Sequence, residues 1–305
     1  MPYFLGIDGG GTKTTCAVGD ETRLLATAMG GPSNIVRVGE VLARQSLRTA
    51  VLQACAAAGI TTQEVARTCV GGAGAARPEL AEVVRSILAE MVSTPVDVFG
   101  DMHIALEAAF DTGPGVVVNA GTGSFAYGRN QAGRTLRAGG WGFAIGDEGS
   151  AHWIGRQAVS AVLRESDRRE DASQLAKTGL VLGLYKAWGV RSILDLARAA
   201  NSVPPPDFAA LFPAVAGSQD EIGCQVLREA GRELAQVASV VIERLFAKEE
   251  TIVPVAMTGG VFRHAEIVQQ VFYNELRKND PRVQVNPAVV DPVEGALRIA
   301  RRAGH

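Results

Sequence analysis

The sequence predicts an α/β protein made of two domains of related topology. Its 305 residues are too many for one ordinary core and fit two domains of about 150 residues. Short apolar segments alternate with longer segments of helical periodicity, which is typical of sheets covered by helices. A strand, a glycine–threonine turn and a second strand occur near residue 3 and again near residue 116. This recurrence indicates that the two halves share a topology.

The first half predicts five short strands and three helices. Apolar residues recur at helical spacing from Val41 to Leu52, and Gly59 supplies a stop. Pro78 suits the first turn of a second helix, reaching to about Met91, because its missing N–H is not needed there. The strands are expected at residues 3–7, 14–18, 24–29, 68–70 and 96–99, and a third helix at 104–110.

The second half predicts fewer strands and more helix. Strands are expected at 116–118, 125–128, 252–257 and 283–285, where short apolar segments are bounded by turn residues. The remaining segments have helical periodicity, and the three prolines at 204–206 predict a loop between two helices. The helices are expected at about 149–165, 171–187, 191–200, 219–247, 260–279 and at the end of the chain.

Composition excludes several classes of protein. Hydrophobic residues make up 47% and charged residues 20%, so the chain has enough apolar surface to fold. Thirty Lys and Arg against 32 Asp and Glu leave a formal charge of −2. The chain therefore lacks the excess of positive charge that is typical of nucleic-acid-binding proteins. No apolar stretch reaches the roughly 18 residues of a membrane span. The four cysteines form no metal-like spacing and are expected to be reduced. A cytoplasmic protein without a nucleic-acid or membrane partner is expected.

A glycine-rich turn follows the first strand at residues 8–14. Gly10 and Gly11 let successive backbone N–H groups converge on an anion, and Thr12 and Thr14 add hydroxyl donors beside Lys13. The turn is neither a Walker A loop nor a dinucleotide fingerprint, because a β-like segment follows it instead of a helix. It predicts a hairpin that binds phosphate, and an ordinary glycine hairpin is the alternative.

The second glycine turn strengthens this interpretation. Gly121, Thr122 and Gly123 offer the same chemistry, so two hairpins could hold one triphosphate across a cleft. Asp8, at the start of the first turn, is placed to bind Mg²⁺ through water, and an Asx-turn is its alternative role. Asp101 follows a buried strand, where a kinase needs a carboxylate that accepts a hydroxyl proton. An N-cap role would also explain Asp101.

Glycines, one tryptophan and two acids are concentrated between residues 139 and 151. Trp141, Gly142 and Asp147 together offer an aromatic wall, a backbone amide and a carboxylate, which suit a sugar. Capping of the next helix is the alternative role of the acids. Farther along, Gly259 and Gly260 open a helix after a strand, a geometry that lets backbone lie flat against adenine and ribose.

These segments together resemble the N-acetylglucosamine kinases within the BadF/BadG/BcrA/BcrD ATPase family of the actin-like superfamily. The resemblance covers essentially the whole chain, and its most specific motifs are Gly-Gly-Trp-Gly at 139–142 and Gly-Asp-Glu-Gly-Ser-Ala at 146–151. It implies two ribonuclease-H-like (actin-like ATPase) domains around a nucleotide cleft. The implied domains are residues 1–114, joined by the last helix 291–305, and residues 115–290.

The resemblance also implies roles for single residues. Thr12 and Thr122 would contact ATP phosphates, Asp101 would be the general base, and Gly259 and Gly260 would meet the adenosine. The sugar would be bound by Asn34, Gly72, Trp141, Gly142 and Asp147.

The implied reaction is ATP- and Mg²⁺-dependent phosphorylation of the 6-hydroxyl of an amino sugar, N-acetylglucosamine first among the candidates. Glucosamine is an alternative substrate, and the resemblance allows a homodimer. The family also contains ATPases that activate acyl-CoA dehydratases and reductases and hold an iron–sulfur cluster through cysteines near the second phosphate turn. Here that strand reads Val118-Asn119-Ala120, without cysteine. A third alternative is a catalytically silent protein that senses sugar.

Overall fold

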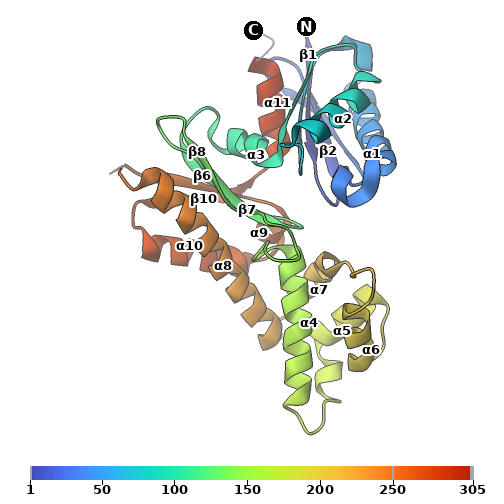
Figure 1. Cartoon of the computed structure of the whole chain (residues 1–305), viewed down its shortest axis with the longest axis vertical. Helices are drawn as coiled ribbons and strands as arrows, with labels where there is room; N and C mark the ends of the chain where they lie inside the picture. Colours follow the sequence, from blue (N-terminus) through green and yellow to red (C-terminus); the bar gives the residue numbers. More distant parts are fainter. Residues whose placement is uncertain (1, 249–250, 303–305) are drawn as a thin grey trace. The chain divides into compact units, whose positions relative to one another are not determined.

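The computed structural model describes residues 2–248 and 251–302 of the chain. The chain divides into two compact units, Met1–Val117 with Val290–His305, and Val118–Val289 (Figure 1). Two five-stranded sheets with covering helices make the protein α/β, as the sequence predicts.

The first unit is built on a mixed sheet of strand order β3-β2-β1-β4-β5. β1 pairs antiparallel with β2 and parallel with β4, and β4 is parallel to β5. The antiparallel pairing of β1 with β2 places the short turn between them at the edge where the parallel strands β1, β4 and β5 end. The strands are β1 (Tyr3–Gly9), β2 (Thr14–Gly19), β3 (Leu24–Gly30), β4 (Val65–Gly72) and β5 (Val96–Gly100).

Helices cover both faces of this sheet, because successive strand residues point to opposite faces. Leu5 packs into the cluster formed with α1 (Ile35–Ala58) and α2 (Pro78–Ala89). Its neighbour Phe4 packs on the other face, among residues of α3 (Asp101–Phe110) and α11 (Pro292–Arg302). A short 3-10 turn, Thr62–Glu64, precedes β4. α2 begins at Pro78, as predicted.

The last helix is tied closely to the rest of the first unit (Figure 1). A Cβ added at Gly295 would lie 2.0 Å from the carbonyl oxygen of Ile104, so α11 and α3 are in backbone contact. Arg302 pairs with the buried Glu107, and Arg301 donates to the carbonyl of Asp20 over 2.7 Å. Residues 303–305 of the predicted final helix lie outside the described residues.

The second unit has a sheet of the same design, with strand order β10-β9-β6-β7-β8. β8 is absent from the sequence prediction because none of its residues is fully buried, which leaves little apolar alternation. Pairing with β7, for example Arg137 opposite Tyr127, defines this strand instead. The strands are β6 (Gly115–Ala120), β7 (Ser124–Arg129), β8 (Thr135–Gly139), β9 (Val253–Thr258) and β10 (Val283–Val290).

The long helix α8 (Glu221–Phe246) packs against β7, β8 and α10 (Glu266–Asn279), with apolar residues at every third or fourth position facing inward. α4 (Ala151–Asp167) carries a group of smaller helices beside it (Figure 1). These elements are η2 (Leu175–Lys177), α5 (Gly179–Trp188), α6 (Ile193–Ala200), η3 (Phe208–Leu211) and α7 (Phe212–Ala216).

Two helices that the sequence predicts as continuous are each interrupted in the structure. The helix expected over 171–187 is a 3-10 turn and then α5, since the Thr178 side chain accepts from the N–H of Val181 and caps a new start. The helix expected over 260–279 is interrupted at Ala265, whose φ of −129° is not helical, so α9 (Gly260–His264) precedes α10. η3 and α7 occupy a region where the sequence predicts only a loop.

Candidate functional site

The carboxyl ends of three parallel strands form the edge that carries the predicted acids of the first unit. Gly9 lies opposite Gly72, and Gly72 lies opposite Gly100. Asp8 precedes the first of these glycines, and Asp101 follows the last. Since parallel strands end at one edge of a sheet, Asp8 and Asp101 are on the same edge.

The first glycine turn is bound directly to the segment that carries Asn34. The N–H of Gly10 donates to the carbonyl of Lys13 over 3.0 Å and closes the turn. The carbonyl of Gly10 accepts from the N–H groups of Ser33 and Asn34 over 3.1 and 3.3 Å. The predicted phosphate turn and the predicted sugar residue Asn34 therefore form one backbone-linked structure.

Thr14 holds the same two segments together from inside. The sequence predicts its hydroxyl as a phosphate donor, but Thr14 is fully buried and this prediction is wrong. Its Oγ1 lies 2.8 Å from the carbonyl oxygen of Gly31 and 2.7 Å from Ser33 Oγ. A hydroxyl has one proton, so Thr14 donates to the carbonyl and Ser33 supplies the proton of the shared bond. The sequence gives no signal for Ser33 beyond its place before Asn34.

Asn34 and Gly72 are both close to the first glycine turn. Asn34 Oδ1 accepts from the N–H of Val36 over 3.1 Å and caps α1, which leaves the amide nitrogen for another partner. Gly72 pairs with Gly9, whose carbonyl accepts from the N–H of Ala73 over 3.0 Å. Both predicted sugar residues of this unit are thus next to the turn.

Negative charge is concentrated at this edge. Burial, and then the carboxylates of Asp101 and Asp291, raise the pKa of Asp8 to about 7, against a smaller opposing effect of Lys13. A divalent cation would relieve this repulsion. No group of three Asp, Glu, His or Cys in residues 2–248 and 251–302 has metal-ligand geometry. The acids present fit Mg²⁺ bound mainly by water and phosphate, as is usual for this ion.

Asp101 is the first residue of α3 and not its cap. The N-cap is Gly100, and the Asp101 carboxylate accepts from the N–H of Met102 over 3.0 Å. The capping alternative is therefore not the arrangement found. His103, in the same first turn, stacks on Phe99 with ring centroids 4.6 Å apart.

The second glycine turn is bound to its own neighbouring segment in the same manner. The N–H of Gly121 donates to the carbonyl of Gly123 over 2.9 Å and closes the turn. The carbonyl of Gly121 accepts from the N–H of Ala151 over 2.9 Å. Ser124 Oγ donates to the carbonyl of Glu148 over 2.7 Å. The turn at 121–124 and the motif at 146–151 are thereby one structure.

Asp147 is buried under this turn. Its side chain lies close to Gly123, where an added Cβ would be 2.7 Å from Asp147 Oδ2. The carboxylate accepts from the backbone N–H groups of Gly142, over 3.3 Å, and of Ser124, and burial outweighs these bonds and raises its pKa. Its φ of 60° is rare for a residue other than glycine and is often found at functional sites. Ser150 caps α4, so capping does not explain Asp147.

Trp141 is 69% exposed, which is unusual for so large an apolar side chain. Arg137 of β8 lies with its guanidinium carbon 4.9 Å from the centroid of the Trp141 ring. The nitrogen of Gly142, next in sequence, bonds Asp147. The predicted sugar residues Trp141, Gly142 and Asp147 are thus contiguous, and Arg137 is a neighbour that the sequence does not reveal.

The turn at 258–260 lies against the second phosphate turn. Gly259 has a φ of 102°, and a Cβ there would be 2.3 Å from the carbonyl oxygen of Ala120. A Cβ on Gly260 would meet nothing within 4 Å. Gly259 is therefore required by the fold, whereas Gly260 faces open space. The candidate adenosine and phosphate residues of the second unit are adjacent.

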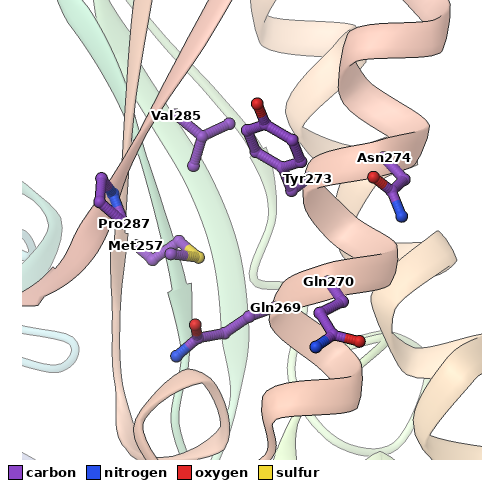
Figure 2. A pocket seen from close by; sticks show the side chains of 7 residues that line it. All are labelled: Met257, Gln269, Gln270, Tyr273, Asn274, Val285 and Pro287. Carbon is purple, nitrogen blue, oxygen red and sulfur yellow. The ribbon is translucent and has the colours of Figure 1, made fainter.

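A hollow of about 270 Å³ lies between α10 and strands β9 and β10 (Figure 2). None of the predicted site residues lines it. Met257 is its only link to the turn at 258–260 among the described lining residues. The hollow is lined by Met257, Gln269, Gln270, Tyr273, Asn274, Val285 and Pro287.

Three of the four cysteines are buried in the first unit. Cys16, Cys55 and Cys69 are buried free thiols, and burial raises the pKa of each. Within the described part of the chain, no helix combines the length and the apolar character needed to cross a membrane.

Comparison with known proteins gives matches over almost the full length. The sequence model described as the BadF/BadG/BcrA/BcrD ATPase family matches residues 5–300. An N-acetylmuramic acid/N-acetylglucosamine kinase of Clostridium acetobutylicum is 31% identical, with 99% of each chain covered. An N-acetyl-D-glucosamine kinase of Dictyostelium discoideum is 28% identical, with 97% of each chain covered.

The fold is also found among solved structures. A protein from Chromobacterium violaceum, provisionally named an N-acetylglucosamine kinase, aligns with a TM-score of 0.74. The alignment covers 98% of this chain and 99% of that one at 24% identity. At this identity the likeness supports the two-sheet fold alone.

Proposed function

Because the chain belongs to the BadF/BadG/BcrA/BcrD ATPase family, we propose that it is an ATP-dependent kinase that phosphorylates the 6-hydroxyl of N-acetylglucosamine. Two full-length relatives carry kinase names that include this sugar. The observation that carries the proposal is the edge of the first sheet. There, Asp8 and Asp101 accompany a glycine turn that is hydrogen-bonded to Asn34.

The general base in this proposal is Asp101. Its carboxylate takes the proton of the sugar 6-hydroxyl as that oxygen attacks the γ-phosphorus. The new bond joins O6 to phosphorus, the bond from phosphorus to the β-bridging oxygen breaks, and ADP leaves. We assign the phosphates to Gly10, Gly11, Thr12 and Lys13, with Gly121, Thr122 and Gly123, and the adenosine to Gly259 and Gly260.

Asp8 would hold Mg²⁺ through water. When bound, the ion neutralises charge on the phosphates. The raised pKa of Asp8 supports this assignment, because the charge of a carboxylate that is buried and lies near two others is stabilised by a nearby cation.

The sugar would be bound by Asn34 and Gly72 of the first unit and by Trp141, Gly142 and Asp147 of the second. Asp147 is suited to a sugar hydroxyl because its carboxylate is already oriented by two backbone N–H groups. Trp141 offers an exposed ring face for the apolar side of a pyranose.

The test is ATP turnover by the purified protein with each of several sugars and with none. The panel is N-acetylglucosamine, N-acetylmuramic acid, glucosamine, N-acetylmannosamine and glucose. Phosphorylation of N-acetylglucosamine, with little ATP hydrolysis in its absence, is expected, and NMR of the product should place phosphate on O6. A preference for glucosamine would make glucosamine the substrate in place of N-acetylglucosamine. Equal hydrolysis in every tube would reject the kinase and favour an ATPase that activates another enzyme.

A further inference from the structure

Arg37 lies against the first glycine turn. A Cβ placed on Gly11 would be 3.4 Å from Arg37 Nη1 and 3.7 Å from its Cδ, so the end of this side chain lies beside the open side of Gly11. Arg37 belongs to the first turn of α1, at the start of which Asn34 is the cap. The sequence alone does not bring residue 37 near residue 11.

The position of Arg37 is fixed by the same bonds that fix Asn34. The N–H of Arg37 donates to the carbonyl of Asn34 over 2.9 Å. The carbonyl of Gly10 in turn accepts from the N–H groups of Ser33 and Asn34. Gly39, with φ of 78°, sets this first turn apart from the rest of α1. The turn therefore follows the glycine hairpin and not the long helix.

We propose that Arg37 contacts the phosphoryl group during its transfer and stabilises its negative charge. The inference rests on the proposed kinase function and adds a residue to it. An arginine presents several N–H donors in one plane, which match phosphate oxygens, and it stays charged at any working pH. Arg37 lies beside Gly11 of the turn and is three residues from Asn34, so it is near both the candidate phosphate and sugar segments.

Lys13 is the other cation of this turn, and its charge partly opposes the rise in the pKa of Asp8. The end of the Arg37 side chain lies on the Gly11 side of the turn.

The test compares Arg37→Ala and Arg37→Lys with Arg48→Ala. Arg48 is an exposed arginine of the same helix, and replacing it by alanine removes the same charge at a position away from the glycine turn. In the Arg37→Ala enzyme, kcat should fall by about 10²- to 10³-fold, the usual loss of one transition-state donor. The KM for the sugar should change by less than about threefold. Arg48→Ala should leave both constants unchanged, and Arg37→Lys should fall between.

Chemical rescue separates contact from structural support. Free guanidinium chloride at non-denaturing concentration should restore part of the kcat of Arg37→Ala and do nothing for Arg48→Ala. Wild-type kcat in Arg37→Ala would overturn the inference. So would a loss that comes with lower thermal stability and without rescue, because Arg37 would then only support the hairpin.

Failure of the kinase proposal is distinguishable from failure of this inference. If the wild-type protein phosphorylates no sugar, the proposed function fails. Calorimetric titration with MgATP then still tests whether Arg37 contacts the phosphates. A Kd for MgATP at least tenfold weaker in Arg37→Ala than in Arg48→Ala would retain Arg37 as a phosphate ligand. Equal Kd values would reject that role as well.

Discussion

The hydroxyl oxygens of Thr14 and Ser33 lie 2.7 Å apart inside the first unit, and they join a glycine turn to the loop that ends at Asn34. The second unit has a counterpart, in which Ser124 Oγ bonds the carbonyl of Glu148 next to Asp147. In each unit a buried hydroxyl thus anchors a candidate sugar segment to a candidate phosphate turn. A displacement of one segment would be passed to the other.

Ser33→Ala tests this anchor. The substitution removes the partner of Thr14 Oγ1 in a buried position, which should lower the free energy of unfolding by about 1–2 kcal/mol. Because Asn34 follows Ser33 directly, the KM for the sugar should rise severalfold. Urea unfolding and steady-state kinetics measure the two effects. Unchanged stability together with an unchanged KM would show that the hydroxyl bond anchors nothing.

Asp101→Asn tests the general base. The amide keeps the size of the side chain but cannot take a proton, so kcat should fall at least 100-fold while sugar and ATP still bind. Asp97→Asn is the matched control, because Asp97 is on the preceding strand but pairs with Arg67 over 2.7 Å. That control should retain kcat and cost no more than about 1 kcal/mol of stability. Near-normal turnover by Asp101→Asn would remove Asp101 from the reaction.

Asp8 should give the magnesium-free protein a stability that falls with rising pH. Its pKa is 3.8 in the unfolded reference and about 7 in the fold, so the folded state holds the extra proton between these values. Stability from this group is complete below about pH 4 and is lost as pH rises through 7. At about 1.4 kcal/mol per pKa unit, the loss is on the order of 4 kcal/mol at most.

Urea unfolding at a series of pH values, without and with Mg²⁺, checks this. Asp8→Asn should flatten the profile relative to the wild type, since other carboxyl groups contribute equally to both. Added Mg²⁺ should favour the carboxylate and move the fall to lower pH. Identical slopes in the two proteins would mean that Asp8 titrates normally.

Gly259 and Gly260 form a matched pair of adjacent positions. Gly259→Ala combines φ of 102° with a Cβ 2.3 Å from the carbonyl of Ala120, so it should cost more than about 2 kcal/mol of stability. Gly260→Ala has open space and should fold normally. If backbone here lies against adenosine, the new methyl should raise the KM for ATP and leave the KM for the sugar unchanged. An unchanged KM for ATP would separate Gly260 from the nucleotide.

Much of the fold follows from local sequence. Strands such as β1 and helices such as α8 have clear periodicity. Pro78 marks the start of α2 and Gly59 the end of α1, as expected. β8 and α7 could not be found in this way. β8 is defined by pairing with β7 and has few buried side chains, and α7 is too short to show a period.

The candidate site residues likewise fall into those that the sequence could indicate and those that it could not. Residues inside motifs, such as Asp101 and Asp147, can be chosen from sequence because glycines and strand ends surround them. Arg37 and Ser33 could not be chosen, because only the folded backbone brings them to Gly11 and Thr14. Arg137 could not be chosen, because its approach to the Trp141 ring depends on how the chain turns between them. Thr14 shows the reverse error, since a hydroxyl in a motif points inward and bonds the protein itself.

The placement of α11 has a consequence for biosynthesis. The first unit is discontinuous in sequence, and its last helix is bonded to groups as distant as Asp20, which leave the ribosome first. Until residues 292–302 emerge, the face formed by Phe4 and Ile104 has no cover. The second unit is encoded without interruption and is complete earlier. During translation the first unit, which carries Asp101, can therefore complete its fold only after the second unit, which carries Asp147, has been synthesised. This holds although synthesis of the first unit begins earlier.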